Sequence, residues 1–532
     1  MFKSPRRKKE ERLANYSKAK KGSFNFNTIS EYFIKKDQTA AFQVVSDKTY
    51  HDLDLDEVFM FIDRTLSKIG QQFLYNSFRV IPQNSERQER CEELISVFRK
   101  NPELKKTAIE QLSRLDSYEA YYISSLFLED HSLKPKWFFI IPILSITGII
   151  SLSLSLFYPQ FLILLVAVLA INYFIHYWNK EKFVHYSGTI LQLIILNQVA
   201  KEFVKSGIVA KSNEEVNNSI RSIDNIGFRM SLFKLEAKIQ SDIGQAVDTL
   251  TDIVKALFLI EPIVFFSVLQ KLNSKKDEIH LLFKKIGEID TAISIDSLRN
   301  ELPYYSVPIL TGKKKYLSAR EIYHPLLQDS VANSIAIDDK SVLLTGSNMS
   351  GKTTFIRTIG INCIVSQTLN TCFAREFSMP RIRIHSAIRI SDDIMNDKSY
   401  YFEEVLTVKS MLEESRSGVQ NLFLLDEMFK GTNSVERISA GKSILTYLNS
   451  ENNIVFISTH DLELAEYLNE GYNLFHFTEI IKDKSIQFDF KIKAGQLKTT
   501  NAIRILELNN YPPEIIAEAI KLSEHIKSIK TK

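Results

Sequence analysis

The fold is decided by one stretch of the sequence, which reads Ser341-Val342-Leu343-Leu344-Thr345-Gly346-Ser347-Asn348-Met349-Ser350-Gly351-Lys352-Thr353-Thr354. It contains the pattern G-x-x-x-x-G-K-[ST], between an apolar run typical of a buried strand and a run compatible with a helix. Glycines let the backbone wrap around a phosphate group, and the N–H groups that begin the following helix attract its charge. The stretch therefore predicts a phosphate-binding loop between a strand and a helix.

The side chains of this loop have the chemistry of a nucleotide site. Lys352 is expected to reach the β- and γ-phosphates, and the Thr353 hydroxyl is expected to ligate Mg²⁺. We expect ATP and Mg²⁺ as cofactors. The residues expected to bind the nucleotide in this loop are Gly346, Ser347, Asn348, Met349, Ser350, Gly351, Lys352, Thr353 and Thr354.

Two further apolar runs end in polar residues. The run 421–425 precedes Asp426 and Glu427, and the run 454–458 is followed closely by His460. Either ending alone is more often an ordinary solvated strand end. Because parallel strands bring their carboxyl ends to one edge of a sheet, we expect Asp426 to hold Mg²⁺, Glu427 to orient or deprotonate the attacking water and His460 to sense the γ-phosphate.

A charge-free segment, residues 137–179, stands out from the average composition. It holds two apolar runs, 137–157 and 161–178, each close to the ~20 residues that cross a ~30 Å hydrocarbon layer. Backbone polar groups in lipid must bond internally, so we expect a transmembrane helical hairpin over residues 134–182, with its turn at Pro159. The alternative is a buried helical hairpin of a soluble domain.

The flanks of these runs support the membrane interpretation. Trp137 and Trp178, the only tryptophans of the chain, stand at the outer ends, where indole rings prefer the boundary between membrane and water. Lysines precede the first run and follow the second. By the positive-inside tendency both soluble parts are expected to be cytoplasmic, so the sequence predicts a multi-pass protein of a membrane such as the bacterial inner membrane, with a lipid bilayer as partner.

The rest of the chain divides into helical and mixed regions. Residues 1–50 begin with a basic run and are expected to form an N-terminal basic tail. Residues 51–133 and 183–302 place apolar side chains at helical spacing, so the hairpin interrupts a mostly helical core. Beyond residue 303, short β-rich runs alternate with helical runs, which predicts an α/β domain with a parallel sheet over residues 303–532.

Composition narrows the functional classes. The 532 residues are 45% apolar and 24% charged, which is typical of a folded protein of several domains. A net charge of +4 argues against a chain devoted to coating nucleic acid. The three cysteines have no metal-type spacing, so a reducing compartment is expected and a zinc site is not.

Taken together, the motifs resemble the MutS family of DNA mismatch-repair ATPases. The loop is similar to that family's T-G-P-N-M-x-G-K-S-T, and the other matches follow in the family's order. They are Tyr323-His324-Pro325, Asp392-Asp393, Ser399-Tyr400-Tyr401-Phe402-Glu403-Glu404, Asp426-Glu427 with Gly431-Thr432, and Ser458-Thr459-His460. In the helical region, Asp63-Arg64-Thr65 and Gly70 resemble the family's D-R-T-x-T-x-x-G. The resemblance implies a mostly α-helical MutS-type core followed by a P-loop (ABC-like) ATPase domain with C-terminal dimerisation helices.

The family's mechanism implies roles that the residues alone do not. These ATPases act as dimers with composite sites, so a homodimer is expected, with Ser399, Thr432 and Ser434 acting in trans. Asn348 is expected to help place the lytic water, as a catalytic residue beside Glu427 and His460.

Adenine recognition departs from the family pattern. The family packs adenine between an aromatic residue before the loop and a histidine near the end of the domain. Ser330 stands at the first of these positions and Phe490 at the second, so we expect Phe490 to contact the nucleotide with altered adenine packing.

DNA binding is implied by the resemblance alone. The family's mismatch-reading domain, with its Phe-x-Glu wedge, and its connector domain have no counterpart before Asp52. We expect an ATPase coupled to mismatched or structured DNA in DNA repair or damage sensing, with no small-molecule substrate beyond ATP.

Two alternatives stay open. One is an ATP-driven mechanical or transport component of the membrane without a DNA role, although no L-S-G-G-Q signature is present. The other is an inactive scaffold, which the presence of the loop, the Mg²⁺ acid, the candidate base and the histidine disfavours.

Overall fold

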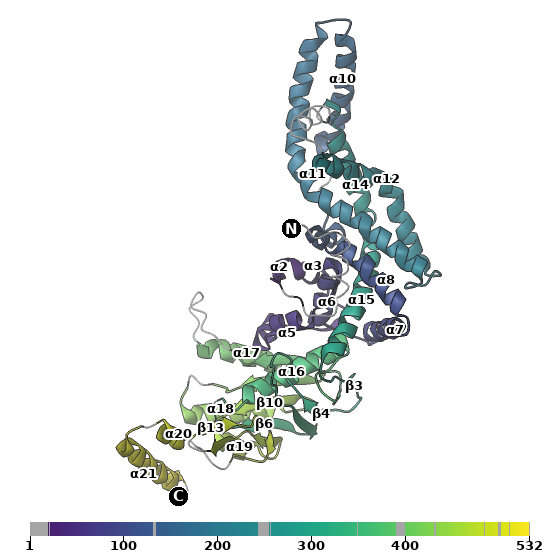
Figure 1. Ribbon diagram of the computed structural model, residues 1–532. Coiled ribbons are helices and arrows are strands. Elements are labelled where there is room, and N and C mark those ends of the chain that lie inside the picture. Colours follow the sequence, from purple (N-terminus) through teal and green to yellow (C-terminus); the bar gives the residue numbers. More distant parts are fainter. Residues whose placement is uncertain are drawn as a thin grey trace. The chain divides into compact units, whose positions relative to one another are not determined.

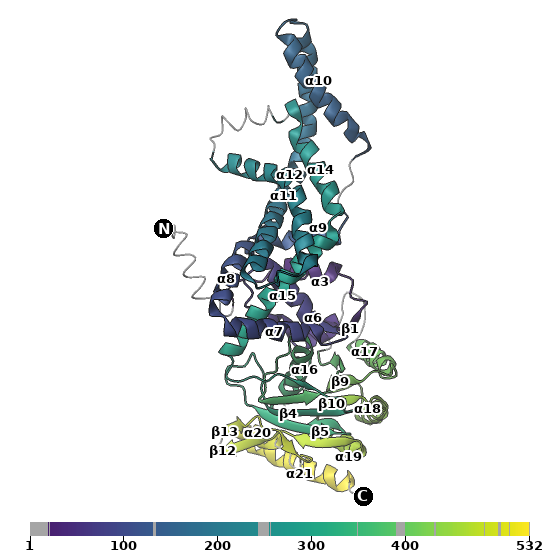
Figure 2. The same cartoon turned by 90° about the vertical axis from the view of Figure 1, so that its right-hand side faces the viewer.

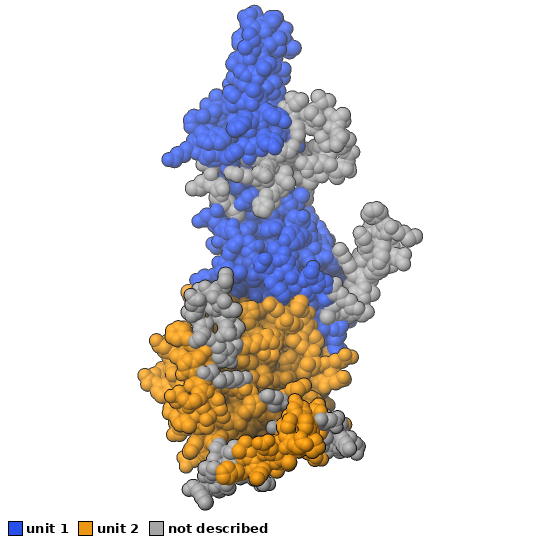
Figure 3. Space-filling model, turned by 90° about the vertical axis from the view of Figure 1, so that its left-hand side faces the viewer, with its two compact units in different colours: residues 1–37, 62–77, 86–301 blue, residues 38–61, 78–85, 302–532 orange. Residues whose placement is uncertain are grey.

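The computed structural model describes residue 20 and residues 22–130, 135–242, 255, 257–347, 349–389, 400–429, 432–482, 485–497, 502–509 and 511–530. The chain forms two compact units, each assembled from segments far apart in the sequence (Figure 3). The helical unit consists of residues 1–37, 62–77 and 86–301, and the sheet unit consists of residues 38–61, 78–85 and 302–532. These units differ from the expected domains, because residues 38–61 and 78–85 pack with the carboxyl-terminal segment.

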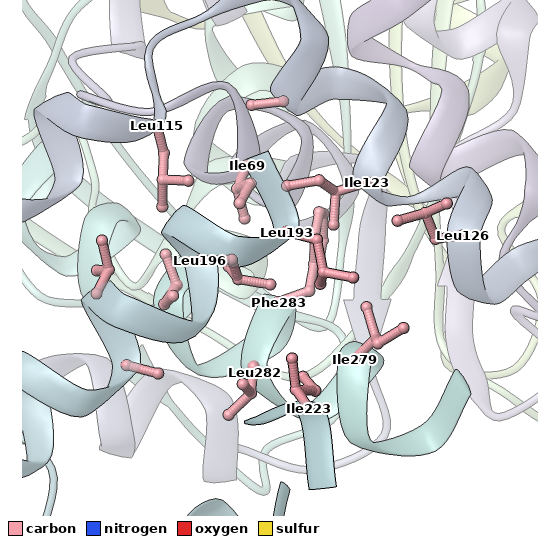
Figure 4. Close-up of a cluster of buried hydrophobic side chains, with 14 of the residues drawn as sticks. Ile69, Leu115, Ile123, Leu126, Leu193, Leu196, Ile223, Ile279, Leu282 and Phe283 are labelled. Carbon is pink, nitrogen blue, oxygen red and sulfur yellow. The ribbon is translucent and has the colours of Figure 1, made fainter. Parts of the chain in front are cut away.

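The helical unit is built from long helices. They are α6 (Lys68–Arg79), whose last two residues belong to the sheet unit, α7 (Glu86–Lys100), α8 (Pro102–Leu112), α11 (Phe161–Ser206), α12 (Glu214–Asp242), α14 (Ile260–Asn273) and α15 (Lys276–Glu301) (Figures 1 and 2). Apolar stripes from several of them meet in one core, where Ile69, Leu193, Ile223 and Phe283 are buried (Figure 4). The mostly helical architecture expected here is therefore observed in the part of the chain that the structure describes.

A polar turn closes this core where α6 begins. Asp290 on α15 accepts hydrogen bonds from the backbone N–H groups of Leu66 (2.9 Å) and Ser67 (2.8 Å) and from the Ser67 hydroxyl (2.6 Å). The carboxylate also lies against Gly70, where a Cβ atom would stand 2.0 Å from Asp290 Oδ2. Burial raises the pKa of Asp290 to about 6, although these hydrogen bonds act to lower it. Close contact between the two helices thus explains the glycine of the D-R-T-x-T-x-x-G motif.

The basic tail expected for residues 1–50 differs from the structure, in which folded elements begin after residue 22. These elements are α2 (Phe26–Ile29), α3 (Glu31–Lys35), β1 (Ala41–Val44) and α4 (Asp47–Asp52). The reason is the set of apolar and aromatic side chains among the basic ones. Tyr32 is buried, with its ring centroid 4.8 Å from that of Phe283 and its hydroxyl 3.2 Å from His280 Nε2.

The charge-free segment forms a helical hairpin. After the short turn η3 (Lys136–Phe139), α10 (Ile140–Ser155) runs antiparallel to the first part of α11 (Figure 1). By length and composition, Lys136–Ser155 and Phe161–Trp178 are each suited to crossing a membrane, and only 22% and 28% of them are buried. Such low burial is unlike a core hairpin of a soluble domain. The second helix continues beyond the expected end of the hairpin at residue 182 and ends at Ser206.

A six-stranded sheet organises the sheet unit, in the order β14-β11-β6-β10-β9-β8. Its strands are β6 (Ser341–Thr345), β8 (Arg383–Ala387), β9 (Asn421–Asp426), β10 (Ile454–Thr459), β11 (Tyr472–His476) and β14 (Lys493–Ala494). All neighbours are parallel except β11 and β14. The three predicted strands β6, β9 and β10 are adjacent, so their carboxyl ends share one edge of the sheet.

Helices cover both faces of this sheet. Side chains that alternate along a strand point to opposite faces. On one face, Phe423 and Leu425 pack with α17 (Tyr400–Glu414), α18 (Ser434–Leu448) and α19 (Leu462–Leu468). On the other, α16 (Lys352–Leu369) passes so close that a Cβ atom on Gly360 would lie 2.6 Å from Leu424 Cδ1. This is the layered α/β arrangement that the alternating runs predict.

The remaining elements surround this layered core. A second sheet, in the order β3-β7-β4-β5, consists of β3 (Ile309–Leu310), β4 (Tyr316–Ile322), β5 (Asn333–Asp338) and β7 (Glu376–Met379). The other elements are β2 (Val80–Pro82), which pairs with β1, α5 (Leu55–Ile62), the hairpin of β12 (Glu479–Lys482) and β13 (Ser485–Phe488), and the last helices α20 (Ala502–Leu508) and α21 (Pro513–Lys530).

Candidate nucleotide site

The loop between β6 and α16 has the backbone that its glycines predict. Gly346 has φ of +152° and Gly351 has φ of +106°, values that side-chain-bearing residues rarely adopt. A Cβ atom on Gly346 would lie 2.8 Å from the Phe477 carbonyl oxygen and 2.9 Å from Ser350 Oγ. The loop thus depends on glycine at both positions, and α16 begins at Lys352 with its N–H groups at the loop.

Lys352 is buried within this loop. Its ammonium group donates hydrogen bonds of 2.9 Å to the carbonyl oxygens of Gly346 and Ser347. These bonds place the positive charge inside the curve of the loop, 3.5 Å from His460 Nε2. A cation and a helix N-terminus facing the same space are a combination that binds phosphate.

The candidate magnesium ligands lie together. The Thr353 hydroxyl donates a 2.7 Å hydrogen bond to Asp426 Oδ2, and the Ser458 hydroxyl donates to the other carboxylate oxygen. These residues come from the start of α16 and from the ends of β9 and β10. Mg²⁺ prefers such oxygen ligands and keeps several of its waters, so the set fits this ion.

Glu427 and His460 form a pair beside this set. Glu427 Oε1 lies 2.6 Å from His460 Nε2, and both side chains are partly accessible. Glu427 has φ of +52°, and its backbone N–H donates to the Ser458 carbonyl at 3.0 Å. This unusual backbone turns the carboxylate away from the strand and toward the histidine. A carboxylate next to an imidazole can hold and pass a proton.

Glu404 supports this turn and was not predicted as a site residue. Its buried carboxylate accepts a 2.6 Å hydrogen bond from the backbone N–H of Phe429, two residues after Glu427. Glu404 therefore positions the segment that carries the candidate base. The signal was present, since Glu404 is the last residue of the stretch 399–404 that resembles the family.

A cavity of about 350 Å³ adjoins the loop. Its lining includes Tyr323, His324, Ser330, Thr354 and Phe490. The ring of Phe490 approaches the loop closely, because a Cβ atom on Gly351 would lie 3.2 Å from its Cδ1. The cavity thus brings together Ser330 and Phe490, the two positions that sequence analysis connected with adenine.

The polar groups around this cavity hold its walls in place. Asn333 donates to the Phe490 carbonyl oxygen at 3.0 Å and accepts from the Ile492 backbone N–H at 2.9 Å. Burial, assisted by the positive charge of Arg357, lowers the pKa of His324 to about 4. His324 is therefore neutral at pH 7, and its Nδ1 accepts a hydrogen bond of 3.3 Å from the Leu326 backbone N–H.

Two aspartates outside the expected motifs also support the site. Asp54 pairs with Arg357 on α16 (2.9 Å) and with Arg389 (2.5 Å) just after β8. Asp52 is buried and accepts hydrogen bonds from the Ser386 hydroxyl (2.7 Å) and the Arg389 backbone N–H (3.0 Å). Residues 38–61 therefore anchor the end of β8 and the helix that follows the loop.

The other expected residues are placed as follows. Thr432 donates a 3.0 Å hydrogen bond to Glu436, Ser434 is exposed at the start of α18, and the Asn433 side chain caps that helix. The exposed side chain of Met349 lies on the loop, and the Ser347 hydroxyl donates to Glu479 at 2.8 Å. Asn348 and Ser399 lie outside the described residues, as does the pair 392–393.

This geometry is similar to that of P-loop nucleotide-binding proteins, with an acid pair at the end of a neighbouring strand. Residues 342–527 match the family model of MutS domain V. The chain is 26% identical over 306 residues to the DNA mismatch repair protein MutS of Thermosipho melanesiensis, and this match covers 56% of the chain and 37% of that protein. It is 27% identical over 320 residues to MutS of Leptospira interrogans, covering 57% of the chain and 36% of that protein.

A similar match is found with MutS of Clostridium tetani, at 24% identity over 317 residues. The chain is therefore similar to MutS, and residues 342–527 of its sheet unit match the model of MutS domain V. The matched part spans little more than a third of the length of these curated relatives.

Proposed function

We propose that this chain is a membrane-anchored MutS-like ATPase that binds and hydrolyses ATP with Mg²⁺. The observation that carries the proposal is the convergence of Lys352, Thr353, Asp426, Glu427 and His460 at the ends of three adjacent parallel strands. Ligands of open α/β sheets bind at such an edge. MutS domain V in the same residues supports the same chemistry.

Each residue has a role that follows from its position. Lys352 and the N–H groups of α16 bind the β- and γ-phosphates, and Thr353 and Asp426 would hold Mg²⁺, which neutralises phosphate charge when bound. Glu427 orients the attacking water and accepts its proton, while His460 holds the Glu427 carboxylate in place and faces the γ-phosphate. Phe490 packs against the base.

We further propose that two copies complete each other's sites. Ser399, Thr432 and Ser434 would contribute to the site of the partner subunit, as the resemblance implies. Ser434 is exposed, which leaves it available for such a contact. The exposed apolar side chains of α21, among them Ile515 and Leu522, are consistent with a C-terminal dimerisation helix.

The hairpin over residues 137–178 would anchor this ATPase in a bilayer, with the soluble parts in the cytoplasm. Its exposed surface is apolar: Leu156, Ile163 and Phe174 are 80%, 79% and 73% exposed. In water such a surface is costly, and in lipid it is not. The tryptophan rings lie 5.3 Å apart at the end of the hairpin opposite its turn, as an interfacial pair would.

The catalytic assignment is tested with two variants. Lys352→Ala should abolish both ATP binding and turnover, because it removes the phosphate-binding cation. Glu427→Gln should abolish turnover and retain ATP binding, because the amide keeps its shape but accepts no proton. Steady-state phosphate release and nucleotide binding, measured on detergent-solubilised protein, distinguish the two. Wild-type turnover in both variants would refute the site.

The curated relatives are named DNA mismatch repair proteins, and we propose that ATP hydrolysis is coupled to mismatched or structured DNA. ATPase rates should therefore rise with homoduplex, mismatched or branched DNA, and this stimulation should weaken with salt as phosphate contacts are screened. A rate that DNA leaves unchanged at every salt concentration would favour the alternative, an ATP-driven mechanical or transport component of the membrane.

A further inference from the structure

A third segment enters the hairpin between its two helices. It consists of residues 257–261, directly before and at the start of α14. Leu259 has φ of +47°, a left-handed value that interrupts the helix at this point. The carbonyl groups of Leu257 and Phe258 stand at this break and need hydrogen-bond partners when buried, and Pro262 has no N–H group to donate to the Phe258 carbonyl four residues before it.

Side chains of the hairpin provide those partners. The buried amide of Asn172 donates a 3.0 Å hydrogen bond to the Leu257 carbonyl, and the Ser145 hydroxyl donates a 2.7 Å bond to the Phe258 carbonyl. Gly148 makes room for the segment, since a Cβ atom there would lie 3.1 Å from Leu257 Cδ1. Leu259 packs with Ile141 of α10 and Ile175 of α11.

The depth of these contacts follows from helix geometry. At a rise of 1.5 Å per residue, Asn172 lies about 9 Å and Ser145 about 12 Å from the level of Trp178 and Trp137. Both contacts are therefore on the turn side of the tryptophan pair. If the tryptophans mark the membrane boundary, the break at Leu259 lies within the hydrocarbon layer, where non-helical backbone is tolerated only when protein satisfies it.

Charge is also neutralised inside this segment. Glu261 is buried, and its two carboxylate oxygens lie 3.1 Å from His176 Nδ1 and 3.1 Å from Lys255 Nζ. A buried carboxylate without such a partner would be strongly destabilising. The contacts of Glu261 with His176 and Lys255 thus allow α14 to begin beside α11, near the level of the two tryptophans.

We propose that residues 257–261 form a re-entrant turn, a third membrane-embedded element that fits between the two transmembrane helices and fixes the start of α14 to the bilayer. This inference rests on the proposed membrane placement of the hairpin. The Asn172 and Ser145 hydrogen bonds hold the turn, and the hairpin that encloses it lies in the lipid hydrocarbon. Since α15 follows α14 after a short connection, the turn gives the helical core a second attachment to the membrane.

The depth of the turn can be measured by fluorescence quenching. Phe258→Trp would be made in a Trp137→Tyr/Trp178→Tyr background, so that it carries the only indole, and reconstituted into vesicles of lipids brominated on the acyl chain. Gln270→Trp in the same background, on the exposed face of α14 farther along the helix, is the matched control. Strong quenching of the indole at position 258, with little quenching of the indole at position 270, is expected.

Further variants test the hydrogen bond and separate the possible failures. Asn172→Leu should reduce the quenching at position 258, whereas Thr147→Val, which removes only a bond to Ile143 in the same helix, should leave it unchanged. Quenching of the native tryptophans by bromine near the headgroups tests the hairpin itself. If they are quenched and the indole at position 258 is not, the re-entrant turn is wrong; if neither is quenched, the membrane placement of the hairpin is wrong.

Discussion

At the residue scale, Phe490 is a clear difference between the cavity beside the loop and the pattern that the family resemblance implies. It stands where the family has a histidine, and its ring contacts the loop at Gly351. Its backbone has φ of +50° and is held by the Asn333 amide, so the ring is positioned by the second sheet. Under the proposed nucleotide binding, stacking on this ring would replace the contact that the histidine makes in the family, while Ser330 offers no second ring.

The first prediction concerns this ring. Phe490→Ala should weaken ATP binding by about 5- to 150-fold, because stacking of a base on an aromatic ring contributes roughly 1–3 kcal/mol. Titration with a fluorescent ATP analogue measures the change. Tyr467→Ala, an exposed aromatic on α19 outside the cavity, is the control and should bind like the wild type. Equal affinities for wild type and Phe490→Ala would remove Phe490 from the site.

Single residues also show the limits of the sequence. Lys352, Thr353 and Asp426 could be predicted as site residues because each belongs to a local pattern next to a strand or a helix. Glu404 belongs to a stretch that resembles the family, but its role did not follow from the sequence, because its partner is a backbone N–H group of Phe429 that only the tertiary fold brings near. Asp54 was missed for the same reason, since it meets Arg357 and Arg389 across more than 300 residues.

At the scale of elements, the contact between α6 and α15 depends on the absence of one side chain. Gly70→Ala should destabilise the helical unit by about 3 kcal/mol, because the new methyl group would overlap the buried Asp290 carboxylate. Gly227→Ala on α12 is the matched control: no atom lies within 4 Å of its added Cβ, so removing a helical glycine there should stabilise by about 0.5–1 kcal/mol. Urea unfolding followed by circular dichroism compares them.

The same contact predicts a pH dependence. Asp290 has a pKa of about 6 in the fold, against about 3.9 in an unfolded chain. Between these pH values the folded protein binds more protons than the unfolded chain. The contribution of Asp290 to the free energy of unfolding is therefore greatest below about pH 4 and falls as the pH rises to about 6. Asp290→Asn should remove this part of the dependence. Urea midpoints from pH 4 to 7 test it, and an unchanged slope in the variant would contradict it.

Elements were easier to predict than their assignment to units. The strands at 341–345, 421–426 and 454–459 could be recognised because continuous apolar runs bounded by polar residues are typical of buried parallel strands. Residues 38–61 could not be assigned to the sheet unit, because their buried partners lie on β8 and α16, far along the chain. The helices α2 and α3 were not predicted, because the basic run near the start of the chain led us to expect a tail there despite the apolar residues that follow.

At the scale of the whole molecule, the proposed composite site makes association depend on nucleotide. Wild-type protein should dimerise transiently with ATP and Mg²⁺, and Glu427→Gln should remain dimeric, because it binds ATP without hydrolysing it. Lys352→Ala should stay monomeric under the same conditions. Sedimentation of detergent-solubilised protein measures the three. A Glu427→Gln variant that binds ATP and stays monomeric would refute a site completed in trans.

The long helix α11 is continuous from the hairpin to the helical core. It extends from Phe161 at the hairpin turn to Ser206, with Leu193 and Leu196 buried in the core at its far end. Under the proposed membrane placement, this one helix lies in lipid hydrocarbon at its first end and in the packed protein core at its other end. A thicker or thinner bilayer would change the tilt of α11, and the change in tilt would move the part of α11 that packs in the core. Lipid composition would then be an input to the catalytic cycle.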